Sequence, residues 1–298
     1  NNKSTNKKMA LFNSNITKEL NGVNFENISF EIENSSLNGN AFLFLNKKLN
    51  LKLNLENFDL NLFELSEQQN SKIDGIIDLD ITLNDFYQVE NVESKISVQN
   101  NRFGSNNFFS ASGKIDYAKS KILLKDSFIF NLGEGSFTLL GDYNIEKEHL
   151  NLEMKLNKAE LESFSYLFDI SYLPQSKING TMYLSGLIDN PSLRGNLNFN
   201  KIKSNNYSLD NLSSTFSINS FNNSKDGSLF LNGKNIQFED ISYDDLEMNF
   251  YFLDDTMYIA KANLSKDKES TVFTGEIINF ENINIDQFRS NINGEKIH

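Results

Sequence analysis

The chain has 298 residues, with 28 Lys and Arg against 40 Asp and Glu, and a formal net charge of −12 at pH 7. This acidic balance argues against a nucleic-acid-binding protein, which needs a basic surface to displace counterions from phosphates. A hydrophobic content of 39% argues against a disordered chain, and the absence of cysteine excludes disulfides, thiolate catalysis and Cys-ligated zinc.

The first twenty residues differ from the rest of the sequence. Asn1 to Lys8 is polar, and Met9 to Leu20 is a candidate for a short amphipathic helix. We therefore expect residues 1–20 to be a polar, partly helical lead-in to a structured region that spans residues 21–298. No run of about 18 apolar residues, the length of a membrane-spanning helix, occurs in the sequence. The chain also lacks a cleavable export signal at its start, and we interpret it as a fragment of a longer protein.

After the lead-in, short stretches in which apolar and polar residues alternate make up most of the sequence. Clear examples are Leu49–Leu55, Ile77–Leu83 and Leu193–Phe199. A period of two places the apolar residues on one face of a half-buried β-strand and the polar residues on the other. Asn-Gly and Asp-Gly pairs favour positive φ and predict the turns between strands. These pairs are Asn21-Gly22, Asn38-Gly39, Asp74-Gly75, Asn179-Gly180, Asp226-Gly227 and Asn232-Gly233.

Helical periodicity is rare beyond residue 20. Glu160 to Phe168 has Leu161, Phe164 and Leu167 at spacings of three residues, which predicts a short helix that caps the sheet.

The sequence repeats itself at intervals of about one hundred residues. Gly39 to Phe63 aligns with Gly141 to Phe164, so that Leu49 corresponds to Leu150, and Ser71–Gly75 aligns with Ser176–Gly180. A third beginning appears near residue 277. We predict one continuous array, with repeat copies at about 39–140 and 141–274 and a partial third copy at 275–298.

Such an antiparallel arrangement could close into a barrel, form a pair of sandwiches or curl lengthwise into a trough. A membrane barrel needs aromatic girdles at both ends of its strands, whereas Phe128, Phe130, Phe250 and Phe252 lie in the middle of predicted strands. A repeat without Pro/Gly-rich linkers favours one continuous structure over sandwiches.

The segment Lys177–Leu197 carries a recognisable motif. It has a short strand between Gly180 and Gly186, an Asn190-Pro191 turn, and a third glycine, Gly195, which opens the next strand. This order resembles the recurrent motif of the TamB and AsmA-like proteins of diderm bacteria. The first copy departs from it, since Ile81 stands at the place of Gly186 and Phe86 at the place of Pro191.

The resemblance implies an all-β fold, an elongated repeat-built antiparallel sheet curled into a U-shaped groove, with a few short helices. It also implies a periplasmic protein that binds phospholipid acyl chains in the groove and guides lipid between the inner and outer membranes. Expected partners are phospholipid, an outer-membrane protein of the Omp85 class and the remainder of its own longer chain, which holds the inner-membrane anchor. A role in outer-membrane protein assembly and a likeness to bridge-like lipid-transfer proteins are further implications.

The apolar faces of the predicted strands supply the candidate lipid-binding groove. A water-filled trough lined by these side chains costs about 25 cal/mol per Å² of apolar surface, which acyl chains would relieve. The candidate groove residues are Leu51, Leu53, Leu55, Ile77, Leu79, Ile81, Leu83, Met182, Leu184, Leu193, Leu197, Phe199, Phe216, Ile218, Phe250 and Phe252. The alternative is a β-rich surface, adhesive or structural repeat protein in which these residues pack into a dry core.

The polar residues give little sign of chemistry. His149 lies in a predicted hairpin turn without an oriented partner. Asp78 and Asp80 could bind an ion but more simply form a solvated strand face. Gly133-Glu134-Gly135 has neither the helix nor the Lys-Ser/Thr of a phosphate loop. We expect no enzymatic activity, no catalytic residues, no metal, no cofactor and no nucleic-acid partner.

Overall fold

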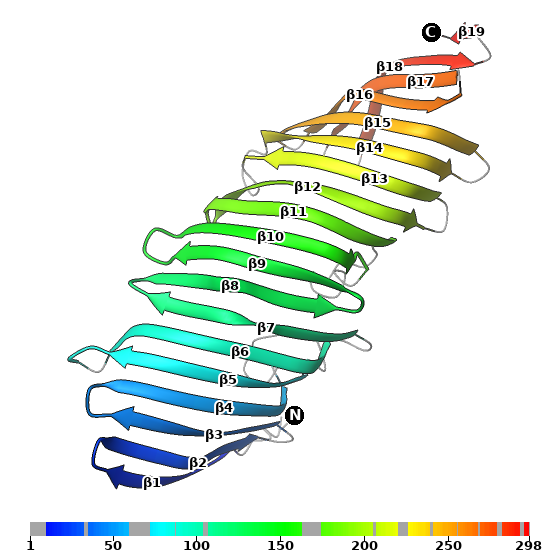
Figure 1. The fold of residues 1–298 in the computed structure, drawn as a ribbon. Helices are drawn as coiled ribbons and strands as arrows, with labels where there is room; N and C mark the ends of the chain where they lie inside the picture. Colours follow the sequence, from blue (N-terminus) through cyan, green and yellow to red (C-terminus); the bar gives the residue numbers. More distant parts are fainter. Residues whose placement is uncertain are drawn as a thin grey trace, which may run out of the picture. The chain divides into compact units, whose positions relative to one another are not determined.

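The computed structural model is all-β, as predicted (Figure 1). It describes residues 10–32, 35–59, 72–86, 88–103, 107–162, 174–204, 207–219, 226–238, 241–254, 256–267, 269–278, 282–292 and 295–297. These residues form nineteen β-strands, and no helix occurs among them. The chain divides into two compact units, residues 1–133 and residues 134–298, which we describe separately.

The first unit is an antiparallel meander in which each strand pairs with the next strand along the chain. Within this unit β1 pairs with β2 only and β8 with β7 only, so the sheet does not close on itself. Its strands are β1 (Ala10–Glu19), β2 (Gly22–Ile32), β3 (Ser35–Phe44), β4 (Lys48–Asp59), β5 (Lys72–Leu83), β6 (Val89–Phe103), β7 (Asn107–Ala118) and β8 (Lys121–Leu132).

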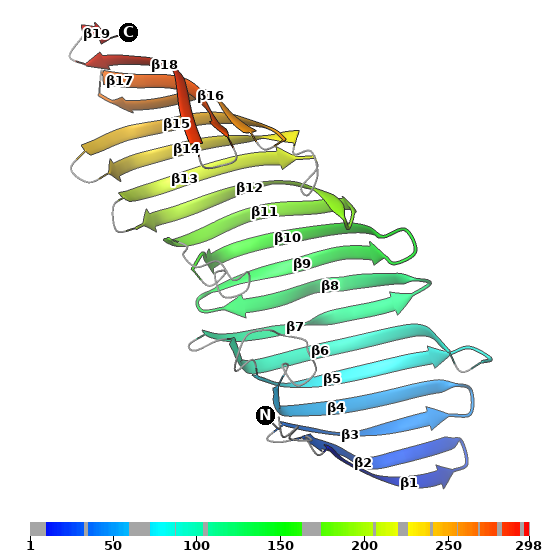
Figure 2. The same cartoon turned by 180° about the vertical axis from the view of Figure 1, so that it is seen from behind.

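The second unit has the same topology (Figure 2). Its strands are β9 (Gly135–Asn144), β10 (His149–Glu160), β11 (Gln175–Leu187), β12 (Asn190–Lys203), β13 (Tyr207–Ile218), β14 (Asp226–Phe238), β15 (Ile241–Leu253), β16 (Thr256–Lys266), β17 (Glu269–Ile278), β18 (Asn282–Ile292) and β19 (Glu295–Ile297).

The predicted helix at Met9 to Leu20 is wrong, because Ala10–Glu19 is strand β1. Phe12 lies opposite Phe30 and Ile16 opposite Phe25, with a register shift between Asn13 and Asn15. Phe12 and Ile16 are four residues apart, a spacing that fits one face of a strand as well as one face of a helix, and pairing with β2 determines that the segment is a strand. The other predicted helix, Glu160 to Phe168, lies mostly outside the described residues: Glu160 ends β10, and Leu161 and Glu162 form a turn.

Most of the expected Asn-Gly and Asp-Gly turns are also wrong. Asn21-Gly22 does connect β1 to β2. Asp74-Gly75 lies inside β5, however, and Asn179-Gly180 lies inside β11. The glycine is needed in these strands because the neighbouring backbone is close: a Cβ on Gly180 would lie 2.1 Å from the carbonyl oxygen of Asn196.

The register of the strands reproduces the sequence repeat. In the first copy Leu55 lies opposite Gly75 and Phe58 opposite Ile73. In the second copy Leu156 lies opposite Gly180 and Ala159 opposite Ile178. Each pair of strands contains a register shift at the same place, next to a residue with positive φ, Asn57 at 47° or Lys158 at 49°. The copy boundaries at 39–140, 141–274 and 275–298 remain predictions.

Buried residues in the second unit form a cluster on one face of the sheet. Phe250, Ile259 and Ala262, from β15 and β16, are its fully buried members. Partly buried side chains from β14 to β17 pack around them: Leu229, Leu231, Met248, Met257, Phe273 and Ile277. Burial of this face stabilises the sheet by about 25 cal/mol per Å² of apolar surface removed from water.

Candidate functional site

All seven predicted groove residues of the first unit belong to one face of the sheet. Cross-strand pairs join Leu51 to Leu79 and Leu53 to Ile77, and Ile81 lies opposite Leu49. Leu55 and Leu83 are in phase with their neighbours on the same strands. The period-two alternation therefore predicted the apolar face of β4 and β5 correctly.

The nine predicted groove residues of the second unit also share one face. Leu184 lies opposite Leu193, which in turn lies opposite Ile218. In the adjacent row of the same face, Met182 lies opposite Gly195, which lies opposite Phe216. The remaining members extend these rows across β12 and β15: Leu197, Phe199, Phe250 and Phe252.

Solvent exposure divides the sixteen predicted residues into two groups. Leu55 and Phe250 are only 3% and 6% exposed, so their side chains pack against neighbours. The other fourteen are half-buried and retain apolar surface that a ligand could cover.

The apolar face contains residues that the prediction missed. Leu152 lies opposite Leu184, and Met154 lies opposite Met182. Leu229, opposite Phe250, and Ile259 join the same face. The signal of Leu229 and Ile259 was weak because the apolar residues Phe230 and Tyr258 occupy the opposite face of their strands. Leu152 and Met154 alternate strictly with polar residues, so the period-two pattern could have identified them.

Glycines on the apolar face leave room for large neighbours. Gly195 lies between Met182 on one side and Phe216 on the other. A Cβ on Gly195 would lie 3.0 Å from the Cζ atom of Phe216 and 2.5 Å from the carbonyl oxygen of Thr181. The Phe216 ring therefore occupies the space above the glycine.

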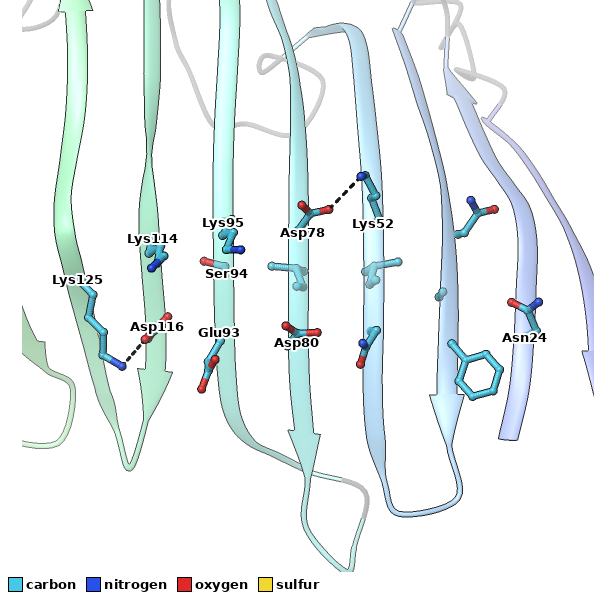
Figure 3. A pocket seen from close by; sticks show the side chains of 16 residues that line it. Asn24, Lys52, Asp78, Asp80, Glu93, Ser94, Lys95, Lys114, Asp116 and Lys125 are labelled. Atoms are coloured by element: carbon cyan, nitrogen blue, oxygen red, sulfur yellow. Dashed lines mark ion pairs between the residues drawn. The ribbon is translucent and has the colours of Figure 1, made fainter. Parts of the chain in front are cut away.

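A polar cavity lies on the opposite face of the first unit (Figure 3). Its volume is about 650 Å³. One row of residues across its floor contains three consecutive lysines: Lys95 lies opposite Lys114, which lies opposite Lys125. The adjacent row is acidic and consists of Asp80, Glu93 and Asp116.

Ion pairs neutralise much of this cavity. The Lys125 Nζ lies 2.6 Å from Asp116 Oδ2, and the Lys114 Nζ lies 2.5 Å from Asp126 Oδ2. Hydrogen bonding to Lys114 lowers the pKa of Asp126, and the reciprocal bond raises the pKa of Lys114. Since like charges directly opposite one another destabilise a sheet, these diagonal pairs compensate for the row of lysines.

The described residues show no cluster of three or more His, Cys, Asp or Glu side chains arranged to hold a metal ion. Asp78 and Asp80 both line the polar cavity, and Asp78 lies 4.0 Å from the Lys52 ammonium. His149 is exposed at the start of β10. Within the described part of the chain, no helix has the length and hydrophobicity to cross a membrane.

These features define a repeat-built, open antiparallel β-sheet protein with rows of apolar side chains that run from strand to strand on one face. Comparison with protein families gives the identity: the TamB N-terminal domain matches residues 5–251. The chain therefore belongs to the TamB family, whose members are transport and assembly proteins of the periplasmic cell envelope. Searches of curated proteins and of solved structures found no match to the chain.

Proposed function

We propose that this chain is a segment of a periplasmic bridge that binds phospholipid acyl chains on its apolar face and guides lipid between the inner and outer membranes. The observation that carries the proposal is the continuity of the apolar rows, which run from strand to strand with half-buried side chains. Membership of the TamB family supports the same role.

The rows suit an acyl chain because their interactions are non-directional. A lipid that moves one strand along, about 4.8 Å, meets side chains of the same kind. Each ~40 Å² of apolar surface that an acyl chain covers contributes about 1 kcal/mol. Binding is therefore strong enough to retain a lipid and uniform enough to let it slide. The headgroup projects from the sheet into water.

Family membership supports three further elements of the proposal. The protein works in the periplasm, anchored in the inner membrane through a segment outside this sequence. It cooperates with an Omp85-class protein of the outer membrane, and its lipid-guiding role extends to support for outer-membrane protein assembly. The rest of its own chain continues the groove, and the protein catalyses no reaction.

Lipid extraction and mass spectrometry of detergent-free protein test the proposal. Wild-type protein should carry phospholipid in about stoichiometric amounts, and Leu53→Arg or Leu197→Arg should reduce it several-fold. Asn198→Arg is the matched control, because Asn198 is an exposed residue on the opposite face, adjacent in β12 to Leu197. Wild-type protein free of lipid, or equal lipid in all variants, would instead support a structural or adhesive repeat protein with a dry core.

A further inference from the structure

Three hairpin turns of the first unit carry largely exposed apolar side chains. Leu20 is 93% exposed in the β1–β2 turn, Leu45 76% in the β3–β4 turn, and Phe86 82% in the β5–β6 turn. These turns lie along the same edge of the sheet, on the left in Figure 1. Turns at alternate strands are about 10 Å apart, so the three side chains form a line of apolar tips along that edge.

Hydrogen bonds join these turns to one another. The Leu45 N–H donates to the Asn21 carbonyl oxygen at 2.9 Å, and the Leu83 N–H donates to the Lys47 carbonyl oxygen at 2.9 Å. The Lys47 Nζ also lies 2.5 Å from Asp85 Oδ1 in the next turn. The tips are therefore held in place, so that binding through them costs little conformational entropy.

A side-chain amide holds the third tip. The Oδ1 of Asn84 accepts hydrogen bonds from the backbone N–H of Phe86 at 2.9 Å and of Gln88 at 3.0 Å. The Asn84 N–H donates to the Gln88 carbonyl oxygen at 2.9 Å. Because the Phe86 side chain is 82% exposed, its burial contributes little to folding.

The charge along this edge differs from that of the whole chain. Residues 1–133 contain 14 Lys and Arg against 16 Asp and Glu, whereas residues 134–298 contain 14 against 24. The four hairpin turns that connect β1 to β8 along this edge are basic on balance. The turns and the strand ends beside them carry Lys18, Lys47, Lys48, Lys119 and Lys121 against Glu19, Asp85 and Glu90.

We propose that this edge, defined by Leu20, Leu45 and Phe86, docks on the surface of a phospholipid bilayer that contains anionic lipid. Apolar tips beside lysines match the boundary between acyl chains and anionic headgroups. A bilayer is flat and fluid, so it accepts three tips in a line without shaped pockets, whereas a protein partner would need hollows at matching intervals. The docking does not depend on lipid binding by the apolar face.

The absence of tryptophan from the chain permits a direct test. Phe86→Trp or Leu45→Trp provides a single fluorophore, and Tyr251→Trp, at a 57% exposed position near the end of β15 in the second unit, is the control. With vesicles of phosphatidylcholine and phosphatidylglycerol, the two tip fluorophores should shift to shorter wavelength and be quenched by brominated lipid, and the control should not. A tip fluorophore that does not respond to vesicles would overturn the proposal. If the emission of a tip fluorophore shifts with protein concentration in the absence of vesicles, the edge mediates contacts between copies of the chain. That result would also overturn the proposal.

Vesicle flotation measures the energetic contribution of the tips. The triple variant Leu20→Ser, Leu45→Ser, Phe86→Ser should bind about tenfold more weakly or worse, while Phe238→Ser, at a position 51% exposed in the second unit, should bind normally. Leu197→Arg should lose its acyl-chain ligand but still float, which separates failure of this proposal from failure of the lipid-guiding function. Equal flotation of the triple variant and the wild type would contradict the assignment.

Discussion

The carboxylate of Asp74 accepts a 2.7 Å hydrogen bond from the backbone N–H of Asn57 on the adjacent strand. Asn57 has a φ of 47° and lies at the register shift of β4. The second repeat copy contains the same arrangement, since the Lys158 N–H donates to the Asn179 Oδ1 at 2.9 Å. A bulge leaves one backbone N–H without a ladder partner, and in both copies the residue before a strand glycine supplies the acceptor.

Removal of this acceptor should destabilise the protein. Asp74→Ala and Asn179→Ala each leave a bulge N–H without its partner, and each should lower the free energy of unfolding by about 1 kcal/mol. Asp74→Asn is the matched control, because Asn performs the same role at position 179 and should retain most of the stability. Chemical denaturation measures the difference. If Asp74→Asn destabilises the protein as much as Asp74→Ala, the negative charge rather than the hydrogen bond is what matters.

Substitution of two glycines in β11 distinguishes the cost of a steric clash from the cost of backbone strain. Gly180→Ala places a Cβ 2.1 Å from a backbone oxygen at a φ of 149°, and should cost about 3 kcal/mol or more. Gly186 has a φ of 114°, but the nearest atom to an added Cβ is 3.7 Å away, so Gly186→Ala should cost only the strain, about 1–2 kcal/mol. The denaturation midpoint should be lower for Gly180→Ala than for Gly186→Ala. The prediction is wrong if Gly186→Ala is the less stable variant.

The sequence was informative where one face of a strand is apolar throughout. Leu53 and Leu197 could be assigned to a face because their neighbours alternate without interruption, and burial of one face specifies the register. The repeat was visible in the sequence because equivalent bulges in the two copies need equivalent residues. The Asn-Gly pairs misled because their turn preference is local, whereas at Asn179-Gly180 the cross-strand bulge and the close backbone approach determine the structure.

Features that depend on several strands could not be predicted. In β1 the four-residue spacing of Phe12 and Ile16 fits a strand face and a helix face equally, and only pairing with β2 decides between the two structures. The polar cavity of the first unit arises from rows that combine Lys95, Lys114 and Lys125 across three strands. No single strand carries that pattern. A single exposed apolar side chain in a turn is ordinary, and the three tips indicate an interaction site only because the folded sheet places them in a line.

The ion pairs of the polar cavity should contribute unequally to the stability of the fold. Asp116 has a side chain only 7% exposed and pairs with Lys125, whereas Asp78, 47% exposed, lies 4.0 Å from Lys52. Lys125→Met leaves a buried carboxylate without its nearest cation, and should lower the melting temperature measurably more than Lys52→Met. The double variant Lys125→Met, Asp116→Leu should recover part of the loss. Equal melting temperatures for the two single variants would show that neighbouring lysines replace Lys125.

Acid should release the ion pair between adjacent turns of the first unit. A hydrogen bond from Lys47 lowers the pKa of Asp85 below its ordinary value of 3.8. A carboxyl whose pKa is lowered in the folded state stabilises that state above its ordinary pKa, and the contribution disappears as the pH falls through the lowered value.

At neutral pH, Asp85→Asn should therefore increase hydrogen exchange at the Leu83 amide, which donates to Lys47 O. Exchange in the variant and the wild type should converge only at a pH below 3.8. The Ile188 amide, which donates to Glu148 O at 2.8 Å in the second copy, is the internal control. A difference at Leu83 that persists in strong acid would show that the ion pair does not hold this turn.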